Sequence, residues 1–281
     1  MNELELSCNA ARNIDTTIND GVLTITMSQP KKLNGWTFPM MEAFKEAFIK
    51  ATKNHSIKVV IFTGKGDYYS AGVDLGGSLK PMLPKKLQQS IVEYNQQLFE
   101  AFLHLPKPIL IAINGPAIGA SVTSSTLCCG IIASEKATFS TPFAKLGVPP
   151  EGCSSVHFPR LLGAENAERM LGKEGWKPTA SEALSIGLVQ WVASDKELLN
   201  EANKIARNWI SQQKERSFLA GSQLKELKAV NAEESIAVAE AFLSAAFMKE
   251  QARFLWSKKK RVPSLVFLSL WLLRPLWARL L

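Results

Sequence analysis

The 281-residue sequence predicts an α/β fold whose C-terminal third is helical. Continuous apolar runs of four or five residues are typical of strands that are buried on both faces. Stretches with apolar residues at helical spacing lie between these runs, which is the order expected for crossover units in a mostly parallel sheet. From about residue 165 onward, helical patterns follow one another without a further strand run.

Four segments are predicted as strands. In the first, Leu23, Ile25 and Met27 alternate with threonines, which indicates a strand with one buried face. The other three are continuous apolar runs at 59–62, 109–113 and 131–133, of which the second ends at an Asn-Gly-Pro turn.

The predicted helices separate and then follow these strands. Apolar side chains recur at helical spacing along 40–51 and 88–105, and later along 164–171, 180–187, 196–213 and 233–256. We therefore divide the chain into a core domain at 1–195, a helical region at 196–257 and a basic and apolar tail at 258–281.

The formal net charge of +8 comes almost entirely from the C-terminal end. Residues 251–281 carry seven basic residues and no acidic one, which leaves 26 basic against 25 acidic residues in the rest of the chain. No basic stripe with interleaved aromatic residues crosses this nearly neutral body, so nucleic-acid binding is not expected.

The cysteines, the histidines and the N-terminal residues carry no signal for a metal site or for a signal peptide. The three histidines and four cysteines lack the spacing of metal ligands, so no metal site is expected. Residues 1–9 lack the basic and apolar regions of a signal peptide. The adjacent Cys128 and Cys129 lie next to an apolar run and are predicted to be buried thiols in a reducing compartment.

Three segments contain residue types suited to chemistry. Segment 65–75 follows a strand and is rich in small residues, which lets backbone N–H groups approach a ligand. Segment 113–121 passes from a strand through a tight turn into a helix N-terminus, whose unpaired N–H groups suit an oxyanion. Taken alone, the first is more simply a glycine-containing turn, and the second equally fits a plain strand-to-helix connection.

The third segment, 143–155, holds one carboxylate among small and apolar residues. Glu151 stands between two prolines and a glycine. Such a carboxyl is easily desolvated, and desolvation raises its pKa toward the value that a base needs at neutral pH. Taken alone, a solvated loop glutamate is the simpler interpretation.

In this order and spacing, the three segments closely resemble the crotonase (enoyl-CoA hydratase/isomerase) family. Ser70-Ala71-Gly72-Val73-Asp74 matches its first oxyanion-loop motif, and Asn114-Gly115-Pro116-Ala117-Ile118-Gly119 matches its second. The resemblance runs from about residue 14 to about 255. It implies a core sheet spiral of repeated ββα units, a helical C-terminal trimerisation region, and homotrimers or hexamers that bind coenzyme A thioesters without a further cofactor.

The resemblance also implies the site residues. An oxyanion hole is formed by the backbone N–H groups of Val73 and Ala120, each of which follows a motif glycine. The two glutamates of the hydratases are replaced here by Thr123 and Phe143, and neither can act as a base. Substrate contacts are implied for Ser70, Ala71, Gly72, Asp74, Leu75, Gly119 and Phe143.

Glu151 occupies a third position, which resembles the base of the 3-enoyl-CoA isomerases, and most of all their peroxisomal branch. This resemblance implies a Δ3,Δ2-enoyl-CoA isomerase of fatty acid β-oxidation, located in the peroxisome. The alternatives are another crotonase-type, hydratase-like acyl-CoA activity and a non-catalytic acyl-CoA-binding protein.

Three stretches depart from the family pattern: 33–36, where the adenine end of coenzyme A is usually held, Cys129-Gly130, and the tail. The apolar run at 262–273 is too short to span a bilayer, which takes about 20 residues. A subunit interface or an unusual chain end is favoured over contact with an anionic membrane surface. The last three residues, 279–281, differ from a Ser-Lys-Leu signal, so a peroxisomal location depends on the resemblance alone, with mitochondria and cytoplasm as alternatives.

Overall fold

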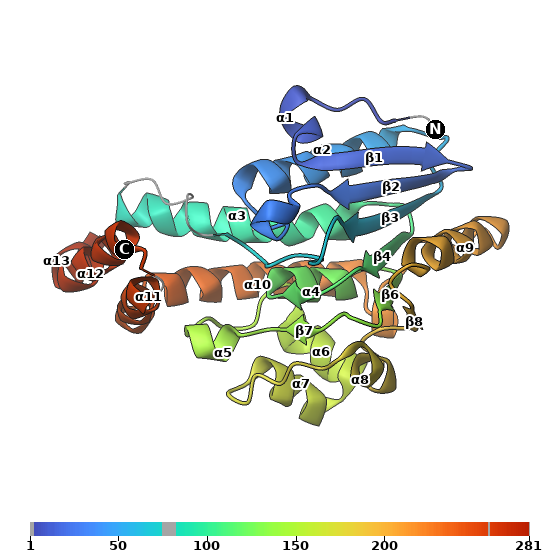
Figure 1. Ribbon diagram of the computed structural model, residues 1–281. Coiled ribbons are helices and arrows are strands. Elements are labelled where there is room, and N and C mark those ends of the chain that lie inside the picture. The colour runs from blue at the N-terminus through green and yellow to red at the C-terminus, as the bar shows by residue number, and fades with distance from the viewer. Residues whose placement is uncertain (1–2, 75–82, 258, 281) are drawn as a thin grey trace.

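The computed structural model describes residues 3–74, 83–257 and 259–280. Figure 1 shows one twisted sheet with helices on both sides and a group of C-terminal helices at the far end of two long ones. The sheet order is β1-β2-β3-β4-β6-β8. Strands β1 (Ile14–Asn19) and β2 (Val22–Met27) are antiparallel, and β3 (Val59–Gly64), β4 (Ile109–Ile113), β6 (Gly130–Ser134) and β8 (Trp191–Ala193) continue in parallel.

A second layer of short extended segments lies beside the main sheet. Strands β5 (Ala117–Ile118) and β7 (Phe139–Ser140) pair in parallel, and single bridges extend this layer through Ser70 and Ala117 and through Trp36 and Val73. After β2, β3, β4 and β6, the chain therefore passes through a short segment of the second layer before a helix follows. The expected α/β fold with a helical C-terminal region is confirmed.

The helices begin and end as follows: α1 (Cys8–Ala11), α2 (Phe38–Lys53), α3 (Pro84–His104), α4 (Ala120–Thr126), α5 (Phe143–Leu146), α6 (Ser154–Leu162), α7 (Ala164–Leu171), α8 (Ala180–Ser185), α9 (Leu198–Ser211), α10 (Leu224–Phe242), α11 (Ala245–Ser257), α12 (Arg261–Leu272) and α13 (Arg274–Trp277). Short 3-10 turns lie at η1 (Pro30–Lys32), η3 (Leu219–Gly221) and η4 (Ala278–Leu280).

Two expectations for the C-terminal third are wrong. The single helix predicted at 233–256 is two helices, because α10 ends at Phe242 and the Ser244 hydroxyl accepts the N–H of Phe247 at 3.1 Å to begin α11. A further strand, β8, joins the edge of the sheet beside β6. It has only three residues, and Trp191 and Val192 are exposed, so it produces no apolar run in the sequence.

Alternate residues of the central strands face two separate cores. Val60 and Phe62 of β3 point toward α2 and α3, where Phe44 and Phe102 pack against the Phe62 ring at centroid distances of 5.6 and 5.8 Å. Val59 and Ile61 point to the other face, which α9 covers with apolar side chains. Burial on both faces explains why β3 and β4 are uninterrupted apolar runs. Cys128, Cys129 and Cys153 are buried free thiols, as predicted for the first two.

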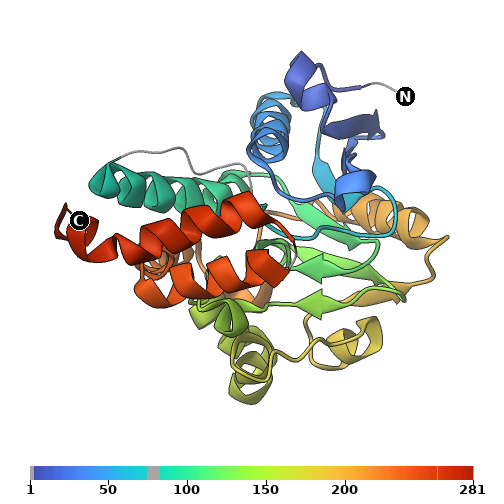
Figure 2. The same cartoon turned by 60° about the vertical axis from the view of Figure 1, so that its left-hand side comes forward.

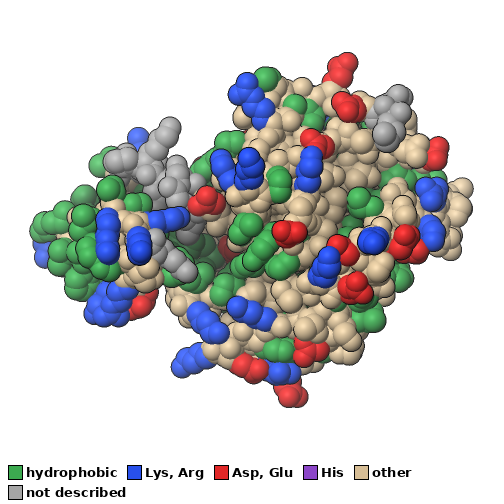
Figure 3. Space-filling model, in the orientation of Figure 1, with side chains coloured by type: hydrophobic (Ala, Val, Ile, Leu, Met, Phe, Trp, Pro, Cys, Tyr) green, Lys and Arg blue, Asp and Glu red, His purple; other side chains and the backbone are tan. Residues whose placement is uncertain are grey.

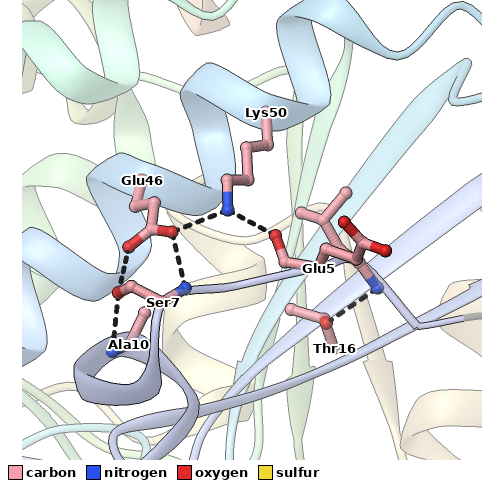
Figure 4. Close-up of polar contacts among 7 residues, drawn as sticks. Glu5, Ser7, Ala10, Thr16, Glu46 and Lys50 are labelled. Carbon is pink, nitrogen blue, oxygen red and sulfur yellow. Dashed lines mark hydrogen bonds and ion pairs between the residues drawn. The ribbon is translucent and has the colours of Figure 1, made fainter.

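The segment before β1 is attached to α2 through Glu46 (Figure 4). Ser7 donates both its backbone N–H and its hydroxyl to the Glu46 carboxylate, at 2.8 and 2.6 Å. Lys50 pairs with the same carboxylate at 2.8 Å and also donates to the carbonyl of Glu5. Hydrogen bonds from Lys50 and Ser7 lower the pKa of Glu46 to about 2, so the Glu46 carboxylate that makes these contacts is ionised at neutral pH.

The C-terminal helices extend the molecule away from the sheet. Helix α10 packs along α3, and Figure 2 shows α11 and α12 side by side across the far end of this pair. Figure 3 shows many hydrophobic side chains on the face of this C-terminal group, together with Lys and Arg. None of the helices within the described ranges is long and apolar enough to cross a membrane.

Candidate active site

A cavity of about 230 Å³ lies beyond the carboxyl ends of the parallel strands. Its walls come from the loops after β3 and β5 and from α3, α10, α11 and α12. Open α/β sheets bind ligands at this edge, where the loops leave the strands. Of the residues that the sequence singled out, the cavity is lined by Ala71, Gly72, Val73, Gly119, Ala120, Phe143 and Glu151.

The two motif glycines bring their loops into direct contact. Gly72 has a φ of 83°, and a Cβ added there would lie 2.5 Å from the carbonyl oxygen of Ile118. Gly119 has a φ of 62° and a ψ of −128°, a conformation that L-residues rarely adopt, and it turns the chain from β5 into α4. Only glycine at position 72 allows the first loop to lie this close to the second.

This contact directs two backbone N–H groups toward the cavity. Trp36 donates to the carbonyl of Gly72 at 2.8 Å and accepts from the N–H of Asp74 at 3.1 Å, so the N–H of Val73 between them points away from Trp36. The N–H of Ala120 is the first of helix α4 and has no partner within the helix. Val73 and Ala120 both line the cavity, so donors from two loops can meet one ligand oxygen.

The remaining predicted contact residues lie elsewhere. Ser70 is fully buried beneath the cavity, where its hydroxyl donates to the Asn34 carbonyl at 2.8 Å and accepts the N–H of Gly72 at 3.1 Å. Its role in this arrangement is to shape the loop. Asp74 is exposed and is not among the described residues that line the cavity. Leu75 lies outside the described residues.

Glu151 is nearly enclosed, with 8% of its surface exposed. The side-chain amide of Asn95 donates to its Oε2 at 2.6 Å. The pKa of Glu151 is raised to about 7, mainly by burial, while the Asn95 hydrogen bond lowers it and the nearby charge of Glu234 raises it. A carboxyl with this pKa can take up and release a proton near neutral pH.

Asn95 is a residue that the sequence prediction missed. The Ser235 hydroxyl donates to its Oδ1 at 2.9 Å, which orients the amide so that the NH₂ group faces Glu151. A signal existed in the sequence, because Asn95 lies four residues after Ile91 on the buried face of a predicted helix. A polar residue on such a face needs a hydrogen-bond partner inside the protein.

Glu234, on α10, was missed as well and holds the loop that carries Glu151. Its two carboxylate oxygens accept the backbone N–H groups of Cys153 and Ser155 at 2.6 and 2.8 Å, at the N-terminus of α6. Burial raises the pKa of Glu234 to about 7, against the effect of these hydrogen bonds. The neighbouring negative charge in turn raises the pKa of Glu151.

Replacing Glu234 by Gln is expected to move the pH profile of any reaction that uses ionised Glu151 toward lower pH. The charge that opposes ionisation of Glu151 is removed, so its pKa falls. The matched control is Glu226→Gln on the same helix, whose carboxylate pairs with Arg160 at 2.6 Å at the surface. A Glu234 variant with reduced activity and an unmoved pH midpoint would indicate a purely structural role.

Neither of the two positions that the resemblance assigns to the glutamates of hydratases holds a carboxylate here, since one is Thr123 and the other is Phe143. Gly152 lies against Thr123, since a Cβ on Gly152 would be 2.5 Å from the Thr123 hydroxyl oxygen. Thr123 is fully buried, and Phe143 presents an apolar ring to the cavity. Among the described residues that line the cavity, Glu151 is therefore the one carboxylate.

The unusual segment 33–36 is part of the framework of the site. The Asn34 side chain accepts the N–H of Gln29 at 3.0 Å and donates to the carbonyls of Lys65 and Tyr68, which joins this segment to the loop after β3. Trp36 is fully buried and stacks on Phe102 at a centroid distance of 5.9 Å. Across the described ranges, no group of three or more His, Cys, Asp or Glu is arranged to hold a metal ion.

Comparisons with known proteins show what this chain is similar to. The model of the family described as enoyl-CoA hydratase/isomerase matches residues 17–258. The chain is 34% identical to the mouse protein named enoyl-CoA delta isomerase 3, peroxisomal, over 89% of this chain and 80% of that one. It is 35% identical to human enoyl-CoA delta isomerase 2, over 87% of this chain and 63% of the relative, and so spans less than two thirds of the human protein.

A solved structure described as enoyl-CoA hydratase/isomerase from Pseudoalteromonas atlantica superposes with a TM-score of 0.75 at 29% identity. The superposition covers 87% of this chain and 97% of the bacterial one. The fold of most of this chain has therefore been observed in an experimental structure.

Proposed function

The chain belongs to the enoyl-CoA hydratase/isomerase family, and from this premise we propose that it is a Δ3,Δ2-enoyl-CoA isomerase, an enzyme that converts 3-enoyl-CoA to trans-2-enoyl-CoA in fatty acid β-oxidation. The observation that carries the proposal is that Glu151 is the one carboxylate among the described residues that line the cavity, while Phe143 presents a ring there and Thr123 is fully buried. Hydration requires a carboxylate that positions and activates water, whereas a double-bond shift requires one base.

The proposed reaction uses Glu151 twice. Its ionised carboxylate takes a proton from C2 of the thioester, and the electron pair moves onto the thioester oxygen as an enolate. The N–H groups of Val73 and Ala120 hold this oxygen, because preorganised donors stabilise charge that develops in a water-poor site. The protonated Glu151 then returns the proton at C4, and the double bond ends between C2 and C3. No atom is gained or lost.

The surrounding residues support this use of one base. Asn95 donates to Glu151 and orients its carboxylate, while Phe143 and the apolar walls exclude water that would otherwise compete for the enolate. Coenzyme A enters as part of the substrate, so no further cofactor is proposed. We also propose a homotrimer or hexamer, and a peroxisomal location because one relative is a peroxisomal isomerase by name.

The direct test is incubation of the purified protein with a medium-chain 3-enoyl-CoA, following formation of the conjugated 2-enoyl thioester. The isomerase proposal predicts conversion without formation of a 3-hydroxyacyl product. A hydroxyacyl product instead would indicate a hydratase-like activity. Binding of the thioester without turnover would contradict the proposal and indicate a non-catalytic acyl-CoA-binding protein.

The pH dependence of kcat/KM is expected to follow ionisation of Glu151 in the free enzyme. Because burial raises the pKa of this group to about 7, its ionised fraction, and therefore kcat/KM, should increase through neutral pH and reach a plateau near pH 8 to 9. The measurement is a series of initial rates between pH 5 and 9 at substrate concentrations well below KM. A midpoint near pH 4 to 5, as for a solvated glutamate, would show that the base is not a buried carboxyl.

A further inference from the structure

The cavity continues from Glu151 along the groove between α3 and α10. On α3, the lining residues run from Leu98 past Asn95, which contacts Glu151, to Leu87, which lies about 12 Å from Asn95 at the usual helical rise. On α10 they run from Val238, close to Ser235, to Phe242 at the end of the helix. Leu87 and Phe242 thus mark the end of the cavity that is remote from Glu151.

This remote end is closed by the C-terminal helices. Phe247 and Met248 of α11 and Phe267 and Leu270 of α12 line the cavity. The rings of Phe242 and Phe247 stack at 4.7 Å, and Phe267 meets Phe247 edge-on at 6.3 Å. Figures 1 and 2 show this group of helices lying across the far end of α3 and α10.

Helix α12 is attached at both of its ends. Near its start, the Ser264 hydroxyl donates to the Ala252 carbonyl of α11 at 2.6 Å in a buried contact. Just after its end, Arg274 Nε donates at 2.9 Å to the carbonyl of Leu243, at the C-terminus of α10. Carbonyls at a helix end have no partner within the helix, so Arg274 stabilises the end of α10 as well as α12.

We propose that α12 forms the end wall of the acyl-chain pocket and sets the longest acyl chain that this protein accepts. Phe267 and Leu270 lie beyond residue 258, where the match to the family model ends, so this wall is supplied by a segment outside the matched part of the chain. An acyl chain that extends past these side chains has no space between α3, α10 and α11. The nature of the ligand, an acyl-CoA thioester, rests on the proposed function.

The test compares two leucines of the same helix. Leu270 lines the cavity, whereas Leu272 is 62% exposed. Affinities of the wild type, Leu270→Ala, Phe267→Ala and Leu272→Ala are measured by calorimetry for saturated acyl-CoA thioesters from hexanoyl to hexadecanoyl. Saturated thioesters bind without reacting, so the result does not depend on isomerase activity.

In the wild type, affinity should increase with chain length up to a limit and then fall. Leu270→Ala and Phe267→Ala should move this limit to longer chains, with a gain of about fourfold for each additional methylene that leaves water. Affinity for the hexanoyl thioester should stay within about twofold, and Leu272→Ala should behave as the wild type.

Three outcomes would overturn the proposal. One is an unchanged length limit in a cavity variant that remains folded by circular dichroism. Another is an equal change in Leu272→Ala, and the third is a uniform loss of affinity at every chain length, which would indicate a general loosening of the C-terminal helices. If Phe267→Ala does not fold, the smaller deletion in Leu270→Ala still decides the question. If the wild type shows a chain-length limit but no isomerase activity, the proposed function is rejected and the proposal for α12 is not.

Discussion

Replacing Glu151 by Gln is expected to reduce kcat for isomerisation by roughly 10³- to 10⁴-fold, the upper part of the range for removal of a general base. The amide keeps the size of the side chain and can still contact Asn95, but it cannot take the C2 proton. Since Glu151 is the one carboxylate among the described cavity-lining residues, no neighbouring group replaces it. Thioester binding should change little, and initial rates beside a calorimetric titration measure the two effects separately.

The same variant should be more stable than the wild type at alkaline pH. The pKa of Glu151 is raised from 4.5 to about 7 in the folded protein, so the folded state binds this proton more tightly than the unfolded state. Its favourable contribution is complete below about pH 4.5 and is lost as the pH rises through about 7. Gln avoids the cost of a buried charge, which is on the order of 3 kcal/mol from this shift.

Thermal melts of Glu151→Gln and wild type at pH 5 and pH 8 test which of the two proteins is more stable at each pH. The difference in Tm should be small at pH 5 and should favour the variant by several degrees at pH 8. Glu93→Gln, at an exposed position on α3, is the control and should alter Tm little at either pH. Full activity in Glu151→Gln would exclude this residue as the base, and an unchanged Tm at pH 8 would show that its carboxyl is solvated.

The substitution Gly72→Ala is expected to remove most of the activity by separating the two oxyanion loops. The added Cβ would lie 2.5 Å from the carbonyl oxygen of Ile118, which is backbone and cannot rotate away. The loops must therefore move apart, and the N–H groups of Val73 and Ala120 no longer converge. Loss of one oxyanion donor costs about 10²- to 10³-fold in kcat, and the strained backbone adds a few kcal/mol of lost stability.

The variant Gly221→Ala is the control that separates the effect of the close contact from the effect of backbone strain. Gly221 also has a positive φ, of 67°, but an added Cβ would meet nothing within 4 Å. This control should lose only the cost of an L-residue in the left-handed region, about 1 to 2 kcal/mol of stability, and keep full activity. Initial rates and urea unfolding of both variants decide the matter, and a Gly72→Ala protein as active as Gly221→Ala would contradict the role given to the loop contact.

Features with a local cause could be predicted from the sequence. The strands β3 and β4 are buried on both faces, so their residues are apolar without interruption and the runs stand out. The stretches around Gly72, Gly119 and Glu151 each allow a simpler interpretation alone, and these residues were predicted because the order and spacing of the three stretches resemble the enoyl-CoA hydratase/isomerase family. Backbone conformation and local polarity depend on adjacent residues, and adjacent residues are what a sequence displays directly.

Only the tertiary structure decided which distant residues meet. Asn95 contacts Glu151 across 56 positions, Ser235 contacts Asn95 across 140, and Glu234 holds Cys153 across 81. Strand β8 and the placement of α12 at the end of the cavity depend in the same way on packing between remote segments. A hydrogen bond between remote segments leaves no periodic pattern along the chain, because its geometry exists only after folding has brought both partners together. The sequence by itself therefore determined the α/β architecture, the two loops and the carboxylate, whereas the fold determined the environment that raises the pKa of Glu151 and the length of the pocket beside it.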